Sequence, residues 1–201
     1  MTTLIETPHG PAQAHLHPAR RPRGALVLGH GAGGGVEAPD LVAATGAALA
    51  QSFTVALVEQ PYRVAGRRSS PPAHHLDAAW LAVVEELAAG ELEGLPLITG
   101  GRSAGARVAC RTAEATGAAG VLCLAFPLQP PGRKGKPPGP TRIDELDAVK
   151  VPMLVVQGEG DRFGMPRPRP NREVVEDKGD HSLRSDPQAV AAAVESWLEA
   201  R

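Results

Sequence analysis

The stretch LPLITGGRSAGARVACRTAEA, residues 95–115, combines the features that decide the fold class of this chain. An apolar run of strand type leads into Gly101-Arg102-Ser103-Ala104-Gly105, and a helix-forming segment follows at once. A strand, a sharp glycine-flanked turn and a helix in this order hold a serine hydroxyl exposed, because the glycines carry no side chain that would clash. The alternative interpretation is a glycine-rich turn in which Ser103 only caps the helix.

Strand-like and helix-like segments alternate along the rest of the chain. The predicted strands are 24–30, 53–62, 96–100, 120–126, 153–157 and 171–176, and the predicted helices are 39–51, 76–89, 104–116 and 187–200. This alternation predicts an α/β fold with a mostly parallel sheet and helices on both faces. Ligands of such sheets bind beyond the carboxyl ends of the strands. The loops that follow the strands are therefore where we expect the chemistry.

Length and composition limit the class of protein. The 201 residues suffice for one hydrophobic core, and 42% hydrophobic with 21% charged residues is ordinary for a folded domain. The net charge of −1 argues against a nucleic-acid partner. The 2 cysteines, Cys110 and Cys123, cannot form a disulfide scaffold or a four-cysteine zinc site, and no apolar run approaches the ~18 residues of a membrane span. We expect one soluble, cytoplasmic domain over residues 1–201, with no cofactor, metal, nucleic-acid or membrane partner.

A serine nucleophile needs a histidine base, and the base needs an orienting acid. His181 is the only histidine downstream of Ser103, so it is the predicted base. Asp161, which follows the apolar run MLVVQ in a glycine-bounded turn, is the predicted acid, and Glu159 is the nearest alternative. Asp177 and Asp180 are less favoured because they share the turn of the histidine.

The attacked carbonyl also needs backbone donors for its developing negative charge. The N–H of Ala104, directly after the serine, is one predicted donor, and Ala32 in the glycine loop His30–Gly35 is the other. Gly31 and Gly33 remain alternatives to Ala32. A dinucleotide-binding loop fits less well, since Val36 stands where the third glycine would be.

Six motifs occur in order: GHGAGGG (29–35), FTVALVEQPY with RVAGRR (53–68), GGRSAGARVA (100–109), AFPLQPPG (125–132), MLVVQGEGDRFG (153–164) and GDHSL (179–183). Together they resemble small single-domain α/β-hydrolases related to dienelactone hydrolase, in particular the KANL/Tex-type branch. The resemblance implies an α/β-hydrolase fold with Ser103 as nucleophile, Asp161 as acid and His181 as base. Dienelactone hydrolases proper carry a cysteine where Ser103 stands, so their substrate does not transfer. Some members of the KANL/Tex branch are subunits of larger assemblies.

We therefore predict a serine esterase or thioesterase that acts on a small acyl substrate through an acyl-serine intermediate. The alternatives are a hydrolase-like binding or assembly module with little turnover, and an acyltransferase. The short interval between Ser103 and Asp161 leaves no room for a sizeable lid, which favours an open site. Residues 127–140 are interpreted either as a flap or as a surface connection. Arg102 and Arg107 either bind an anionic substrate or, as we favour, form ion pairs.

Overall fold

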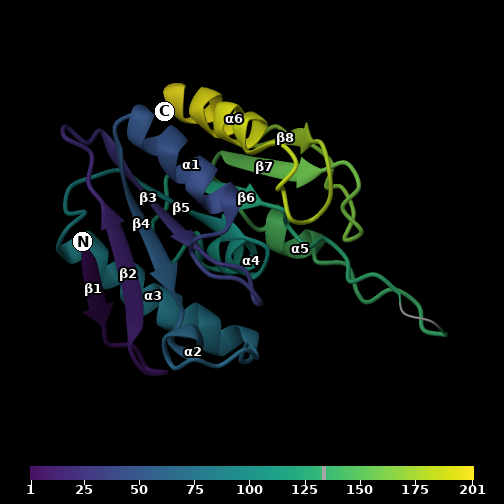
Figure 1. Ribbon diagram of the computed structural model, residues 1–201, viewed down its shortest axis with the longest axis horizontal. Helices are drawn as coiled ribbons and strands as arrows, with labels where there is room; N and C mark the ends of the chain where they lie inside the picture. The colour runs from purple at the N-terminus through teal and green to yellow at the C-terminus, as the bar shows by residue number, and fades with distance from the viewer. Residues whose placement is uncertain (133–134) are drawn as a thin grey trace.

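Eight strands form one sheet in the computed structural model, which describes residues 1–132 and 135–201 (Figure 1). The strands are β1 (Thr2–Ile5), β2 (Ala12–His17), β3 (Gly24–Gly29), β4 (Phe53–Glu59), β5 (Leu97–Arg102), β6 (Gly120–Leu124), β7 (Met153–Gly158) and β8 (Arg172–Asp177). Their order in the sheet is β1-β2-β4-β3-β5-β6-β7-β8. The pairings β1–β2 and β2–β4 are antiparallel, and those from β4 to β8 are parallel. The predicted mostly parallel sheet is confirmed.

Helices cover both faces of this sheet. They are α1 (Pro39–Ala50), α2 (Pro61–Val64), α3 (Ala73–Ala89), α4 (Ala104–Thr112), α5 (Ile143–Asp147) and α6 (Pro187–Glu199). The α1 and α6 helices pack side by side on one face, and α3, α4 and α5 cover the other (Figure 1). No helix of the described part of the chain is long and apolar enough to cross a membrane.

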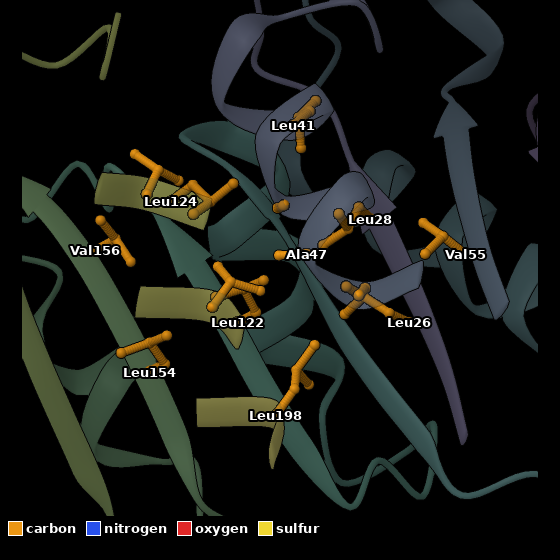
Figure 2. Packing of buried hydrophobic residues seen from close by; sticks show 14 of the residues in the cluster. Leu26, Leu28, Leu41, Ala47, Val55, Leu122, Leu124, Leu154, Val156 and Leu198 are labelled. Atoms are coloured by element: carbon orange, nitrogen blue, oxygen red, sulfur yellow. The ribbon is translucent and has the colours of Figure 1, made fainter. Parts of the chain in front are cut away.

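The central strands are buried on both sides, so alternate residues belong to different cores. In β3, Leu26 and Leu28 point toward α1 and α6, whereas Ala25 and Val27 point toward α3. Figure 2 shows the first core, in which leucines and valines of β3, β4, β6 and β7 meet Leu41 of α1 and other helical side chains. Burial on both faces explains why these strands are almost continuously apolar.

The hairpin formed by β1 and β2 was not predicted from the sequence. The β2 sequence AQAHLH does alternate, and Ala12, Ala14 and Leu16 are buried. Two of these three residues are alanines, so the apolar signal was weak. The turn between the strands is held by the N–H of Gly10 donating to the carbonyl of Thr7 at 3.2 Å.

Several predicted boundaries were wrong by a few residues. The strand predicted to end at Tyr62 ends at Glu59, because Pro61 begins the short helix α2. The helix predicted from Leu76 begins at Ala73, directly after Pro72. The helix after Ser103 ends at Thr112, four residues early, and the strand before it continues to Arg102. The short helix α5 was also missed.

Candidate active site

Ser103 lies on a strained turn between β5 and α4. Its backbone has φ 53° and ψ −106°, a region that costs a non-glycine residue about 1–3 kcal/mol. The N–H of Ser103 donates to the carbonyl of Leu124 at 2.9 Å, which ties the turn to β6. A Cβ on Gly101 would lie 2.5 Å from the carbonyl oxygen of Gly29, and one on Gly105 would overlap the same carbonyl. The two flanking glycines are therefore needed for α4 to start this close to β3.

The structure brings Ser103, His181 and Asp161 together from three different loops. His181 Nε2 lies 2.9 Å from the hydroxyl oxygen of Ser103, and His181 Nδ1 lies 2.7 Å from Oδ2 of Asp161. The Asp161 side chain is fully buried, whereas that of His181 is 21% exposed. The ring of Phe163 packs on the imidazole at a centroid distance of 4.5 Å. With Asp161 on Nδ1, the serine faces Nε2, which is the arrangement that proton transfer from the hydroxyl requires.

Gln157, the buried amide of β7, holds the predicted acid Asp161 and was missed from the sequence. Its Nε2 donates to Oδ2 of Asp161 at 2.8 Å and to the carbonyls of Phe126 and Gly164 at 3.0 and 2.9 Å. Oδ1 of Asp161 accepts the N–H of Phe163 at 2.9 Å. The single polar residue in the otherwise apolar run MLVVQ was the signal that could have revealed it.

His30 orients the glycine loop that carries the predicted donor Ala32. Nε2 of His30 accepts the N–H of Gln60 at 3.1 Å, so Nδ1 carries the proton and donates to the carbonyl of Gly31 at 2.8 Å. Burial lowers the pKa of His30, which keeps the ring neutral as this arrangement requires. Because the peptide is trans, a fixed Gly31 carbonyl aims the N–H of Ala32 in the opposite direction.

Two further features concern the predicted backbone donors. The hydroxyl of Tyr62 donates to the carbonyl of Ala32 at 3.0 Å, which fixes the next peptide of the glycine loop. Ala104 is the first residue of α4, so its N–H has no partner within the helix and lies at the positive end of the helix dipole. The two predicted donors thus lie in the segments next to Ser103: Ala32 in the glycine loop and Ala104 at the start of α4.

A cleft of about 850 Å³ opens over the serine and is lined by the glycine loop, Ser103, Phe163 and His181. Four arginines also line it: Arg63, Arg102, Arg162 and Arg184. Two glutamates oppose them, Glu37 and Glu59, and the second pairs with His15 at 3.0 Å. The arginines therefore outnumber the carboxylates in this cleft.

The two arginines singled out from the sequence form ion pairs. Nε of Arg102 lies 2.8 Å from Oδ2 of Asp40, and Nη2 of Arg107 lies 2.5 Å from Oε1 of Glu145. Arg107 does not line the cleft, whereas Arg102 does. The ion-pair interpretation therefore holds for both, with Arg102 also present at the wall of the site.

The connection between β6 and α5 does not cover the serine. Figure 1 shows this segment extending away from the body of the molecule. Its two sides are joined by the N–H of Arg142 donating to the carbonyl of Leu128 at 2.8 Å and by the N–H of Gly139 donating to that of Pro130 at 2.9 Å. None of its described residues, 127–132 and 135–142, lines the cleft. Of the two interpretations of residues 127–140, the structure supports the surface connection; residues 133–134 lie outside the described part.

The two cysteines lie where α4 packs on β6, and neither lines the cleft. Cys110 of α4 and Cys123 of β6 are free and buried, with sulfur atoms 3.5 Å apart. Their mutual hydrogen bond and burial hold the pKa of Cys110 well above its usual value. Among residues 1–132 and 135–201, no group of three or more His, Cys, Asp or Glu side chains is arranged to hold a metal ion.

A parallel sheet wound on both faces, with a strained serine at a strand–helix turn and a histidine and aspartate from later loops, defines the class of α/β-hydrolases. The chain belongs to the alpha/beta hydrolase domain family, whose model matches residues 22–193. No sequence among the curated proteins matches it.

Solved structures show the same fold at low sequence identity. XC6422 from Xanthomonas campestris, described as an a/b serine hydrolase without lid, superimposes with a TM-score of 0.74 at 20% identity, over 98% of this chain and 94% of that one. Est1E from Butyrivibrio proteoclasticus gives 0.74 at 16% identity, over 98% and 96%. Dienelactone hydrolase from Anabaena variabilis gives 0.75 at 14% identity, over 99% and 94%. The expected α/β-hydrolase fold without a lid domain is confirmed.

Proposed function

We propose that this protein is a serine esterase or thioesterase that acts on a small acyl substrate through an acyl-serine intermediate. In this mechanism His181 takes the proton of Ser103 as its hydroxyl oxygen attacks the acyl carbon. Asp161 holds the tautomer of His181 and stabilises the imidazolium that forms. The N–H groups of Ala32 and Ala104 donate to the oxyanion, and His181 gives the proton to the leaving group as its bond to the acyl carbon breaks. Water then attacks the acyl-serine with His181 as base, which releases the carboxylic acid and restores the Ser103 hydroxyl.

One observation carries the proposal: the unbroken chain of hydrogen bonds from the hydroxyl of Ser103 through His181 to the buried Asp161, at 2.9 and 2.7 Å. A serine that only capped α4 would use its side chain on the helix, and Ser103 makes no such cap. The backbone of Ser103 is strained, and strain of this kind is concentrated at functional sites.

The charge of the cleft favours a substrate that carries a negative group. Arg63, Arg162 and Arg184 line the cleft, and none of them has a carboxylate within ion-pairing distance in the described part of the chain. Unpaired guanidinium groups bind carboxylate or phosphate well. We propose small esters or thioesters with an anionic substituent, and a cytoplasmic location in keeping with the absence of a bond between Cys110 and Cys123, the only cysteines of the sequence.

The test is covalent labelling with a fluorophosphonate together with turnover of p-nitrophenyl acetate. We expect labelling of the wild-type chain and its loss in Ser103→Ala, with turnover reduced by about 10³-fold or more. Ser103→Ala should remain folded, because it removes only the hydroxyl group. Absence of labelling in the folded wild-type chain would instead indicate a hydrolase-like binding module, and labelling that persists in Ser103→Ala would exclude Ser103 as the nucleophile.

A further inference from the structure

Arg102 links the turn that carries Ser103 to helix α1 and to the loop that carries His181. It is the last residue of β5 and directly precedes Ser103 in the chain. Its Nε pairs with Asp40 in the first turn of α1, the helix that follows the glycine loop, at 2.8 Å. Its Nη2 donates to the backbone carbonyl of His181 at 3.2 Å.

The same side chain also packs against the glycine loop itself. A Cβ on Gly31 would lie 2.8 Å from Nη1 of Arg102 and 3.5 Å from Cβ of Ser103. The guanidinium therefore lies directly against Gly31, in the loop that carries the proposed oxyanion donor, at the point where this loop also approaches Ser103. A larger residue at Gly31 would push it away.

Asp40 is the counter-ion that keeps Arg102 in this position. Its side chain is fully buried, and its Oδ1 accepts the N–H of Leu41 at 3.0 Å. Burial raises the pKa of Asp40, and the charge of Arg102 opposes this shift. The charged form of the buried Asp40 therefore depends on Arg102 as its partner.

We propose that Arg102, held by Asp40, is a positioning residue. It fixes the backbones of the loop that carries His181 and of the glycine loop His30–Gly35 relative to Ser103. It acts through the carbonyl of His181 and the packing on Gly31. Its planar fork is what allows one side chain to serve both Asp40 and His181, and a lysine has no equivalent. This inference rests on the proposed function, because it assigns a role within the same site.

The key variant replaces the whole pair, Asp40→Leu/Arg102→Met. Removing one partner would leave a buried charge and destabilise the fold, whereas apolar replacement of both partners of a buried pair is often neutral for stability. The matched control is Asp77→Leu/Arg111→Met, which removes the part-buried pair between α3 and α4 that lies at 2.6 Å and outside the cleft.

We expect the Asp40/Arg102 double variant to stay folded with a Tm close to that of the wild type, while kcat for p-nitrophenyl acetate falls by about 10²-fold. KM and the control variant's kcat should change little. Arg102→Lys, which keeps the charge but not the fork, should give an intermediate kcat. A folded double variant with wild-type kcat would overturn the proposal. If the double variant does not fold, a wild-type kcat in Arg102→Lys would overturn it.

A spectroscopic measurement separates this inference from the proposed function. The proton between His181 and Asp161 should give a far-downfield NMR signal in the wild-type chain that is lost or broadened in the double variant and kept in the control. This readout needs no turnover. If the wild-type chain fails to react with fluorophosphonate, the proposed function fails, while an unchanged NMR signal in the double variant would refute the positioning role alone.

Discussion

Gln157→Met tests how the buried acid is held, because it keeps the shape of the side chain and removes its donors. The carbonyl of Phe126 still accepts the N–H of Leu128 at 2.9 Å, and Asp161 still pairs with His181 at 2.7 Å. The carbonyl of Gly164 keeps no other donor within the described residues. The loss is one charge-assisted hydrogen bond, about 1.5–3 kcal/mol, and one orphaned carbonyl, about 1–3 kcal/mol.

One gain offsets part of this loss. Oε1 of Gln157 is buried and has no hydrogen-bond partner in the described part of the molecule, so its removal returns about 1–3 kcal/mol. The net expectation is a loss of about 2 kcal/mol in the free energy of unfolding. Catalysis should fall by about tenfold, well short of the ~10⁴-fold effect of replacing the acid of such a triad, because Asp161 stays in place but less firmly held.

Urea unfolding followed by the fluorescence of the buried Trp80 and Trp197 measures the first effect, and ester turnover measures the second. The control is Gln129→Met, which removes an exposed amide that donates to the carbonyl of Gly139. The control should change stability by less than about 0.5 kcal/mol. If Gln157→Met has the urea midpoint and kcat of the wild type, the amide does not hold the acid.

The other predictions concern backbone, charge and specificity. Gly105→Ala should abolish activity and destabilise the fold, since its Cβ would lie 2.5 Å from the carbonyl carbon of Gly29. The control Gly46→Ala, on the open surface of α1, should stabilise the fold by about 0.5–1 kcal/mol. Thermal melts compare the two variants, and a stable, active Gly105→Ala would contradict the reasoning. Burial raises the pKa of Asp177, so the folded state favours its protonated form. The contribution of Asp177 to the free energy of unfolding is therefore present below the unfolded pKa of about 3.9 and is lost as pH rises through the folded pKa. Asp177→Asn should therefore raise Tm at pH 7 and leave it unchanged near pH 3, and equal Tm values at pH 7 would exclude this. Arg162→Met/Arg184→Met should lower kcat/KM for the p-nitrophenyl monoester of succinate and spare that for p-nitrophenyl acetate; equal losses for both esters would argue against anion recognition.

The fold was largely predictable because the central strands are buried on both faces and therefore read as apolar runs bounded by glycine or proline. The residues of the candidate triad stand directly after such runs or just before the last helix, which is why a linear pattern could single them out. Gln157, His30 and Tyr62 could not be assigned in the same way. Their roles depend on which carbonyl or carboxylate each one meets across the sheet, and that is set by register and packing. The β1–β2 hairpin was missed because alanine carries little apolar signal, although Ala12 and Ala14 are buried in the sheet.

Among the residues that the structure describes, no segment covers the cleft, and this has a consequence for the fate of an acyl group on Ser103. Bulk water would reach the acyl carbon from the open side of the cleft without any part of the chain having to move. An alcohol or amine acceptor would have no enclosed pocket in which to accumulate, so it would compete with solvent only through its own concentration. The partition of the intermediate would thus favour hydrolysis over transfer, and adding an acceptor alcohol should divert product only in proportion to its concentration.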